Sequence, residues 1–132
     1  MSQEKVDIVR ASYEAFLRGD FEASLHAYSR DSEWDDRATR PDGRIHRGHE
    51  AIAEVVRTWR GTFSDYSWEL EEMLDAGHET VIVYTERGRG KGSGAQVENR
   101  RGNVVTVDRG KIVRTVLHPI AEAALRAAGL AS

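Results

Sequence analysis

The spacing of apolar residues changes along the chain and predicts two kinds of element. In the first half, apolar residues recur every three or four positions, which is the period of one face of an α-helix. This period predicts helices over residues 3–18 and 20–28, and a third helix between Gly48 and Gly61 in which Ile52 and Trp59 share one face. A short acidic strand around Trp34 is predicted between the second and third helices.

From residue 68 the period falls to about two, which is typical of β-strands. The pattern predicts strands over residues 68–74, 81–84, 97–107 and 112–118. The glycine-rich segment 88–94 is either a flexible hairpin loop or the frayed end of two long strands. Pro119 fits the first turn of a closing helix, which ends near Gly129.

This order of elements predicts one α+β domain over residues 1–132. Helices that precede consecutive strands favour a mainly antiparallel sheet with the helices covering one face. The strand over residues 81–84 is apolar on both faces, so the opposite face of the sheet also requires cover.

Composition excludes several classes of protein. The chain has 132 residues, 19 Lys and Arg against 22 Asp and Glu, and a formal charge of −3, which argues against a general nucleic-acid binder. The basic residues near segment 88–94 are balanced locally by Glu86 and Glu98. The absence of cysteine excludes disulfides, zinc–thiolate sites and cysteine nucleophiles.

Targeting signals are also missing from the sequence. No apolar run approaches the roughly 20 residues needed to cross a bilayer. Charges interrupt the N-terminal segment where a signal peptide would be apolar. We therefore expect a cytoplasmic protein with neither a membrane nor a nucleic acid as partner.

Several short motifs, taken together, resemble a known superfamily. They are FLRGD at the end of the first helix, a second helix ending at Tyr28, the acidic strand with Trp34, RGHEAI before the third helix, DRGKIVR in the last hairpin, and EAALRAAGL at the end. Their order, over residues 4–130, is similar to that of the nuclear-transport-factor-2-like (NTF2-like) superfamily, and most similar to its SnoaL-like branch, which includes ketosteroid isomerases and polyketide cyclases.

The resemblance implies a cone, with a curved sheet wrapped around helices and a mostly apolar pocket at the wide end. It also implies a homodimer paired through the outer face of the sheet. The sequence shows no motif for metal or nucleotide chemistry, so no cofactor is expected. It does not imply a single activity, because this fold hosts isomerases, cyclases, hydrolases, dehydratases and non-catalytic dimerisation modules.

Asp36 is the first candidate catalytic residue. Counted from Tyr28, it falls where ketosteroid isomerases place their proton-shuttling aspartate. A carboxylate in an apolar pocket holds a proton more readily than one in water, so it can take a proton from carbon and return it. Trp34 would point the same way and Arg37 the opposite way, leaving no cationic partner in the strand. The alternative is a solvated acidic pair, Asp35 and Asp36.

The electrophilic partners of that isomerase are not matched. Its first-helix tyrosine aligns closer to Ser12, with Tyr13 one residue out of phase, and a one-residue shift rotates a helical side chain by about 100°. Its strand aspartate aligns near Gly102. Without two donors there is no oxyanion hole, so we do not expect ketosteroid isomerisation.

Other candidates have a functional and a structural interpretation. His118 is expected at the pocket floor as a second catalytic group, or else it satisfies a backbone group at a strand end. Arg100 is expected to bind a ligand carboxylate, or else to form a surface charge pair with Glu98 or with a neighbouring strand. The candidate lining residues, which can equally be ordinary core, are Tyr13, Phe16, Trp34, Trp59 and Tyr84.

Two functions remain open at this point. The first is a small cofactor-independent enzyme that acts on an apolar carbonyl or polyketide-like molecule, with Asp36 as acid and base. The second is a non-catalytic protein that binds a small hydrophobic ligand or serves as a dimerisation module. The five histidines show no metal-binding spacing, so no metal is expected.

Overall fold

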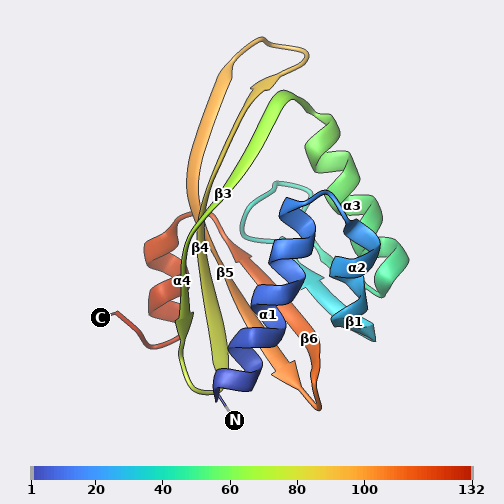
Figure 1. Cartoon of the computed structure of the whole chain (residues 1–132). Helices are drawn as coiled ribbons and strands as arrows, with labels where there is room; N and C mark the ends of the chain where they lie inside the picture. The colour runs from blue at the N-terminus through green and yellow to red at the C-terminus, as the bar shows by residue number, and fades with distance from the viewer. Residues whose placement is uncertain (1, 132) are drawn as a thin grey trace.

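The computed structural model describes residues 2–131 (Figure 1). Its helices are α1 (Ser2–Leu17), α2 (Phe21–His26), α3 (His49–Gly61) and α4 (Ala121–Ala127). Its strands are β1 (Tyr28–Asp35), β2 (Ile45–Arg47), β3 (Phe63–Asp75), β4 (Glu79–Gly90), β5 (Gln96–Asp108) and β6 (Lys111–His118). Within this part of the chain no helix combines the length and apolar character needed to cross a membrane.

The strands form one curved, open sheet in the order β2-β1-β6-β5-β4-β3. All neighbours are antiparallel except β1 and β6, which run parallel. Figure 1 shows α1, α2 and α3 on one side of the sheet and the short α4 on the other. The predicted α+β class, with a curved, mainly antiparallel sheet and a short C-terminal helix, is confirmed.

The second helix is shorter than predicted. It ends at His26, and Tyr28 opens β1 with its side chain buried in the core. The amide of Ile112 in β6 donates to the carbonyl of Ala27 over 2.8 Å, so the chain leaves the helix to pair with the sheet. The prediction that this helix continues to Tyr28 is therefore wrong, because helical period alone does not reveal a competing strand partner.

The two faces of the sheet carry separate cores. Ile82 and Tyr84 of β4 face α1 and join the larger core. Val81 and Val83 face the other way and pack with Val104 and with alanines of α4. The expectation that all helices cover one face is wrong for α4, which supplies the second cover within the same chain.

In segment 88–94, residues 88–90 belong to a strand and residues 91–94 to the turn that follows it. β4 continues to Gly90 and β5 starts at Gln96, with Arg89 paired to Gln96 at the end of the hairpin. The turn is closed by a bond from the amide of Gly90 to the carbonyl of Ala95 over 2.9 Å. Two long strands therefore form this hairpin.

Candidate functional site

A cavity of about 120 Å³ lies between the inner face of the sheet and helices α1, α2 and α3. The aromatic residues that the sequence suggested as lining all lie at its wall: Tyr13, Phe16, Trp34, Trp59 and Tyr84. Trp68 of β3 joins them, with its ring centroid 5.5 Å from that of Tyr13 and 4.6 Å from that of Tyr84. The cavity therefore has the flat apolar surfaces that suit a small ring compound.

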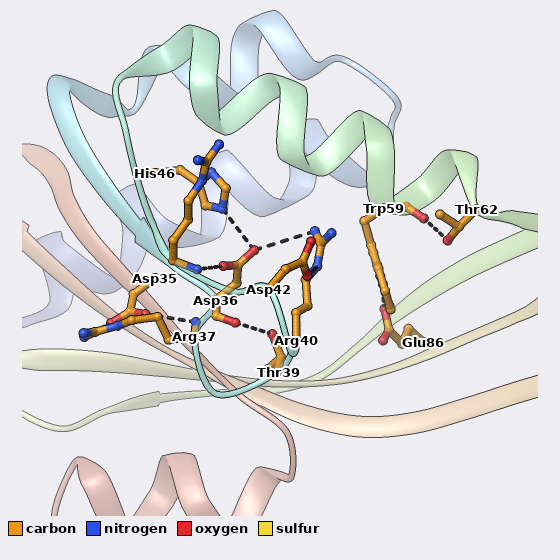
Figure 2. Close-up of polar contacts among 11 residues, drawn as sticks. Asp35, Asp36, Arg37, Thr39, Arg40, Asp42, His46, Trp59, Thr62 and Glu86 are labelled. Atoms are coloured by element: carbon orange, nitrogen blue, oxygen red, sulfur yellow. Dashed lines mark hydrogen bonds and ion pairs between the residues drawn. The ribbon is translucent and has the colours of Figure 1, made fainter.

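Asp36 lies at the wall of this cavity and is only 2% exposed. Its Oδ1 accepts a hydrogen bond from the amide of Arg44 over 2.8 Å. Its Oδ2 lies 3.1 Å from Nε2 of His46 and 3.7 Å from a guanidinium nitrogen of Arg40 (Figure 2). Arg37, the basic residue next to it in the chain, pairs with Asp35, so the partners of Asp36 come from the following loop and from β2 and not from its own strand.

Asp35 faces the other way. It is 4% exposed, and its carboxylate accepts two side-chain hydrogen bonds from Arg37, over 3.0 and 2.8 Å. These hydrogen bonds lower the pKa of Asp35. The alternative of a solvated acidic pair is therefore wrong, since both aspartates are buried and each has its own partners.

The loop after β1 folds back over Asp36. The amide of Asp36 donates to the carbonyl of Arg44 over 3.2 Å, and Arg44 returns a hydrogen bond to the Asp36 carboxylate. Only glycine fits at position 43, where a Cβ atom would lie 2.3 Å from the carbonyl oxygen of Asp36. The sequence Pro41-Asp42-Gly43, a turn signal, thus brings Arg40 and His46 to the aspartate.

A second buried carboxylate, Glu86, lies at the same wall. Its Oε2 accepts from the indole of Trp59 over 3.0 Å and from the hydroxyl of Tyr66 over 2.9 Å, while Oε1 lies 2.9 Å from Nε of Arg101. From the sequence alone, Glu86 is interpreted as a counter-charge for the basic residues near segment 88–94. Its strand parity with Ile82 and Tyr84, both on the inner face, is the signal that identifies it.

Two candidates lie on the outer face of the sheet. His118 pairs with Gly102, whose face carries α4, so the predicted place of His118 at the pocket floor is wrong. Arg100 is also outside the cavity, where it contacts Glu71 over 3.1 Å and Glu122 over 3.4 Å. Its neighbour Arg101 lines the pocket, because adjacent residues of a strand point to opposite faces.

The inner face also holds a polar network that the sequence missed. Nδ2 of Asn103 donates to the hydroxyl of Tyr13 over 3.1 Å, and the hydroxyl of Tyr84 donates to Oδ1 of Asn103 over 3.3 Å. Burial raises the pKa of Tyr13 well above its ordinary value, so this phenol keeps its proton near neutral pH. Tyr13 and Asn103 each lie one residue beyond the aligned positions Ser12 and Gly102, and both line the cavity.

The aligned positions themselves cannot act in the cavity. The hydroxyl of Ser12 donates to the carbonyl of Ser24 over 2.9 Å. Gly102 lies against α4 on the outer face. The hydrogen-bonding side chains that do line the cavity are Tyr13 and Asn103, the residues that follow these two aligned positions.

A curved sheet that wraps α1 to α3 around an apolar pocket defines the NTF2-like class of protein. The model of the SnoaL-like domain matches residues 9–115, and the chain belongs to this family. An NTF2-like protein from Burkholderia thailandensis is 27% identical, with a TM-score of 0.81 over 92% of this chain and 95% of that chain.

Two further solved structures share the fold. An NTF2-like protein from Burkholderia xenovorans is 26% identical, with a TM-score of 0.76 over 97% of this chain and 98% of that chain. A candidate polyketide cyclase from Xanthomonas campestris pv. campestris is 22% identical, with a TM-score of 0.71 over 96% and 98% of the two chains. Among curated proteins there is no match.

Proposed function

We propose that the chain binds a small apolar carbonyl compound in the cavity and that Asp36 transfers a proton within it. The observation that carries the proposal is a carboxylate, 2% exposed, at the wall of a cavity that is rich in aromatic side chains. Similarity to a candidate polyketide cyclase agrees with this class of ligand but does not identify it.

In the proposed reaction, the Asp36 carboxylate takes a proton from the carbon next to the carbonyl group. The electron pair of that C–H bond forms a C=C bond with the carbonyl carbon, and the π pair of the carbonyl group moves to its oxygen. Hydrogen-bond donors stabilise the resulting enolate. Tyr13 and Asn103 are the candidate donors, because both line the cavity and burial keeps the Tyr13 phenol protonated. Return of the proton to the same or another carbon completes an enolisation or isomerisation.

The second candidate function is non-catalytic binding of a hydrophobic ligand. It is favoured by the partners of Asp36, which all come from the segment after β1: Arg40, Arg44 and His46. Such contacts also suit an aspartate whose only role is to anchor this segment over the pocket. The two functions differ in whether Asp36 acts on the ligand.

Exchange of carbon-bound hydrogen separates the two functions. Phenylacetone, a one-ring ketone, is incubated with the protein in D₂O, and loss of its α-proton signal is followed by NMR. We expect the wild type to accelerate exchange and Asp36→Asn to lose about 10²- to 10⁴-fold of that acceleration, the usual range for one acid–base group. Asp35→Asn, the same substitution on the opposite face, should retain it.

Binding is measured on the same samples from the line width of the ketone signals. Asparagine is nearly isosteric and can still accept from the amide of Arg44, so Asp36→Asn should bind phenylacetone as the wild type does. Exchange that survives in Asp36→Asn would overturn the role of Asp36. Binding without accelerated exchange in the wild type would favour the non-catalytic function.

A further inference from the structure

The cavity wall carries more positive than negative side chains. Its arginines are Arg40, Arg57, Arg60 and Arg101, and its carboxylates are Asp36 and Glu86. Arg40 is paired with Asp36 and Asp42, and Arg101 with Glu86. Within residues 2–131, Arg57 and Arg60 have no carboxylate within ion-pair distance.

Arg60 is held by aromatic rings instead of by a counter-charge. Its guanidinium carbon lies 5.5 Å from the ring centroid of Phe16, 5.0 Å from that of Phe21 and 5.5 Å from that of Tyr66. Cation–π contacts of this kind hold the planar group but leave the N–H bonds at its edge available. A partly buried arginine at a cavity wall without an anionic partner is therefore a candidate binding group.

Arg101 also contacts an aromatic ring at the wall, with its guanidinium carbon 5.7 Å from the ring centroid of Trp59. Its charge is already paired, because Nε of Arg101 lies 2.9 Å from Oε1 of Glu86. Among the residues that the structure describes, Arg60 therefore differs from Arg101 in having aromatic contacts without a carboxylate partner.

We infer that the natural ligand is a ring compound that carries, in addition to its carbonyl group, a carboxylate or a similar planar oxyanion, and that this anionic group binds Arg60. Its ring would lie against the aromatic wall, and a volume of about 120 Å³ matches a single ring or a little more. This inference rests on the proposed function for the pocket itself, but it does not require that Asp36 transfers a proton.

The test compares a charged probe with a neutral one of the same shape. Benzoate and benzamide are titrated into the full chain at pH 7.5, and affinity is measured by calorimetry and from the NMR signal of the Trp59 indole N–H. We expect benzoate to bind at least about tenfold more tightly than benzamide, since hydrogen bonds to charged groups are the stronger ones. Arg60→Gln should remove this preference and leave benzamide binding nearly unchanged.

Two further variants test whether the preference for benzoate depends on the planar guanidinium of Arg60. Arg60→Lys keeps the charge without the planar fork, so it should retain part of the preference. Arg10→Gln removes an exposed arginine of α1 away from the cavity and should retain all of it. Equal binding of the two probes by the wild type, no saturable benzoate binding, or an unchanged preference in Arg60→Gln would each overturn the inference. Exchange of the α-protons of phenylacetone is measured independently of benzoate binding. A failure of the proton-transfer role of Asp36 is therefore distinguished from a failure of anion binding by Arg60.

Discussion

His118 lies on the outer face of β6, where burial lowers the pKa of its imidazole and the charge of Asp35 opposes this effect. A pKa below the ordinary value of about 6.5 means that the unfolded chain binds this proton first as the pH falls. The contribution of His118 to stability is therefore complete above about pH 6.5 and decreases as the pH falls toward the folded-state pKa.

We expect His118→Gln to lose less stability than the wild type between pH 7.5 and pH 5.5. The difference should stay below about 1 kcal/mol, because the imidazole is partly exposed to solvent. Urea unfolding at the two pH values measures it, with His78→Gln as a control on an exposed turn histidine. Equal losses in His118→Gln and the wild type would show that another group causes the pH dependence.

At the residue scale, the alternation of side chains along a strand predicts which of them reach the cavity, once one residue of that strand is known to face it. Trp34 and Asp36 are two apart and both reach the cavity, as expected for one face of a strand. The prediction that Arg100 and His118 reach the cavity is wrong, because their strands present the adjacent residues, Arg101 and Leu117, to it. A one-residue error of register exchanges every side chain between the faces, and only pairing with neighbouring strands fixes the register.

At the element scale, α4 packs directly against Gly102 of β5. A Cβ atom at Gly102 would lie 2.5 Å from Cβ of Ala124 and 3.4 Å from Cα of Ala121. We expect Gly102→Ala to lower the free energy of unfolding by about 1–3 kcal/mol, the usual cost of overpacking, because strand and helix must separate. Urea denaturation monitored by circular dichroism measures the change.

Two variants test this explanation of Gly102→Ala. Gly92→Ala, where a Cβ atom meets nothing within 4 Å, should cost much less. Adding Ala124→Gly to Gly102→Ala should recover part of the loss, so that the double variant is more stable than the sum of the two single changes predicts. If the losses of the two single variants simply add in the double variant, contact with Ala124 is not the cause of the destabilisation by Gly102→Ala.

The elements of the site differ in how well the sequence predicts them. The helices α1 and α3 and the long strands follow from their periods, which extend over many residues. β2 was not predicted, because Ile45–Arg47 is too short to show an alternation. His46 therefore could not be placed beside Asp36, a contact that needs the whole intervening loop.

At the scale of the whole molecule, the predicted homodimer stays a prediction, and its basis has changed. The apolar residues on both faces of β4 and β5 suggested a partner subunit, but α4 covers Val81, Val83 and Val104. The outer face beyond α4 is charged instead, with Arg87 close to Glu69 and Glu98, and Arg100 close to Glu71. A second copy on this face would meet mainly polar side chains.

We therefore expect any dimer through the outer face of β3, β4 and β5 to depend on ionic strength. Charge pairs at an interface weaken as salt screens them, with a screening length of about 10 Å at 0.1 M and about 3 Å at 1 M. Light scattering at micromolar concentration should give a dimer in low salt and a larger monomer fraction in 1 M salt. Arg87→Glu should weaken the dimer, because it places a third acid beside Glu69 and Glu98. Arg10→Gln, on α1 at the other side of the sheet, should not. A monomer in low salt would rule out this arrangement, whereas a dimer unaffected by both salt and Arg87→Glu would place the interface on another surface.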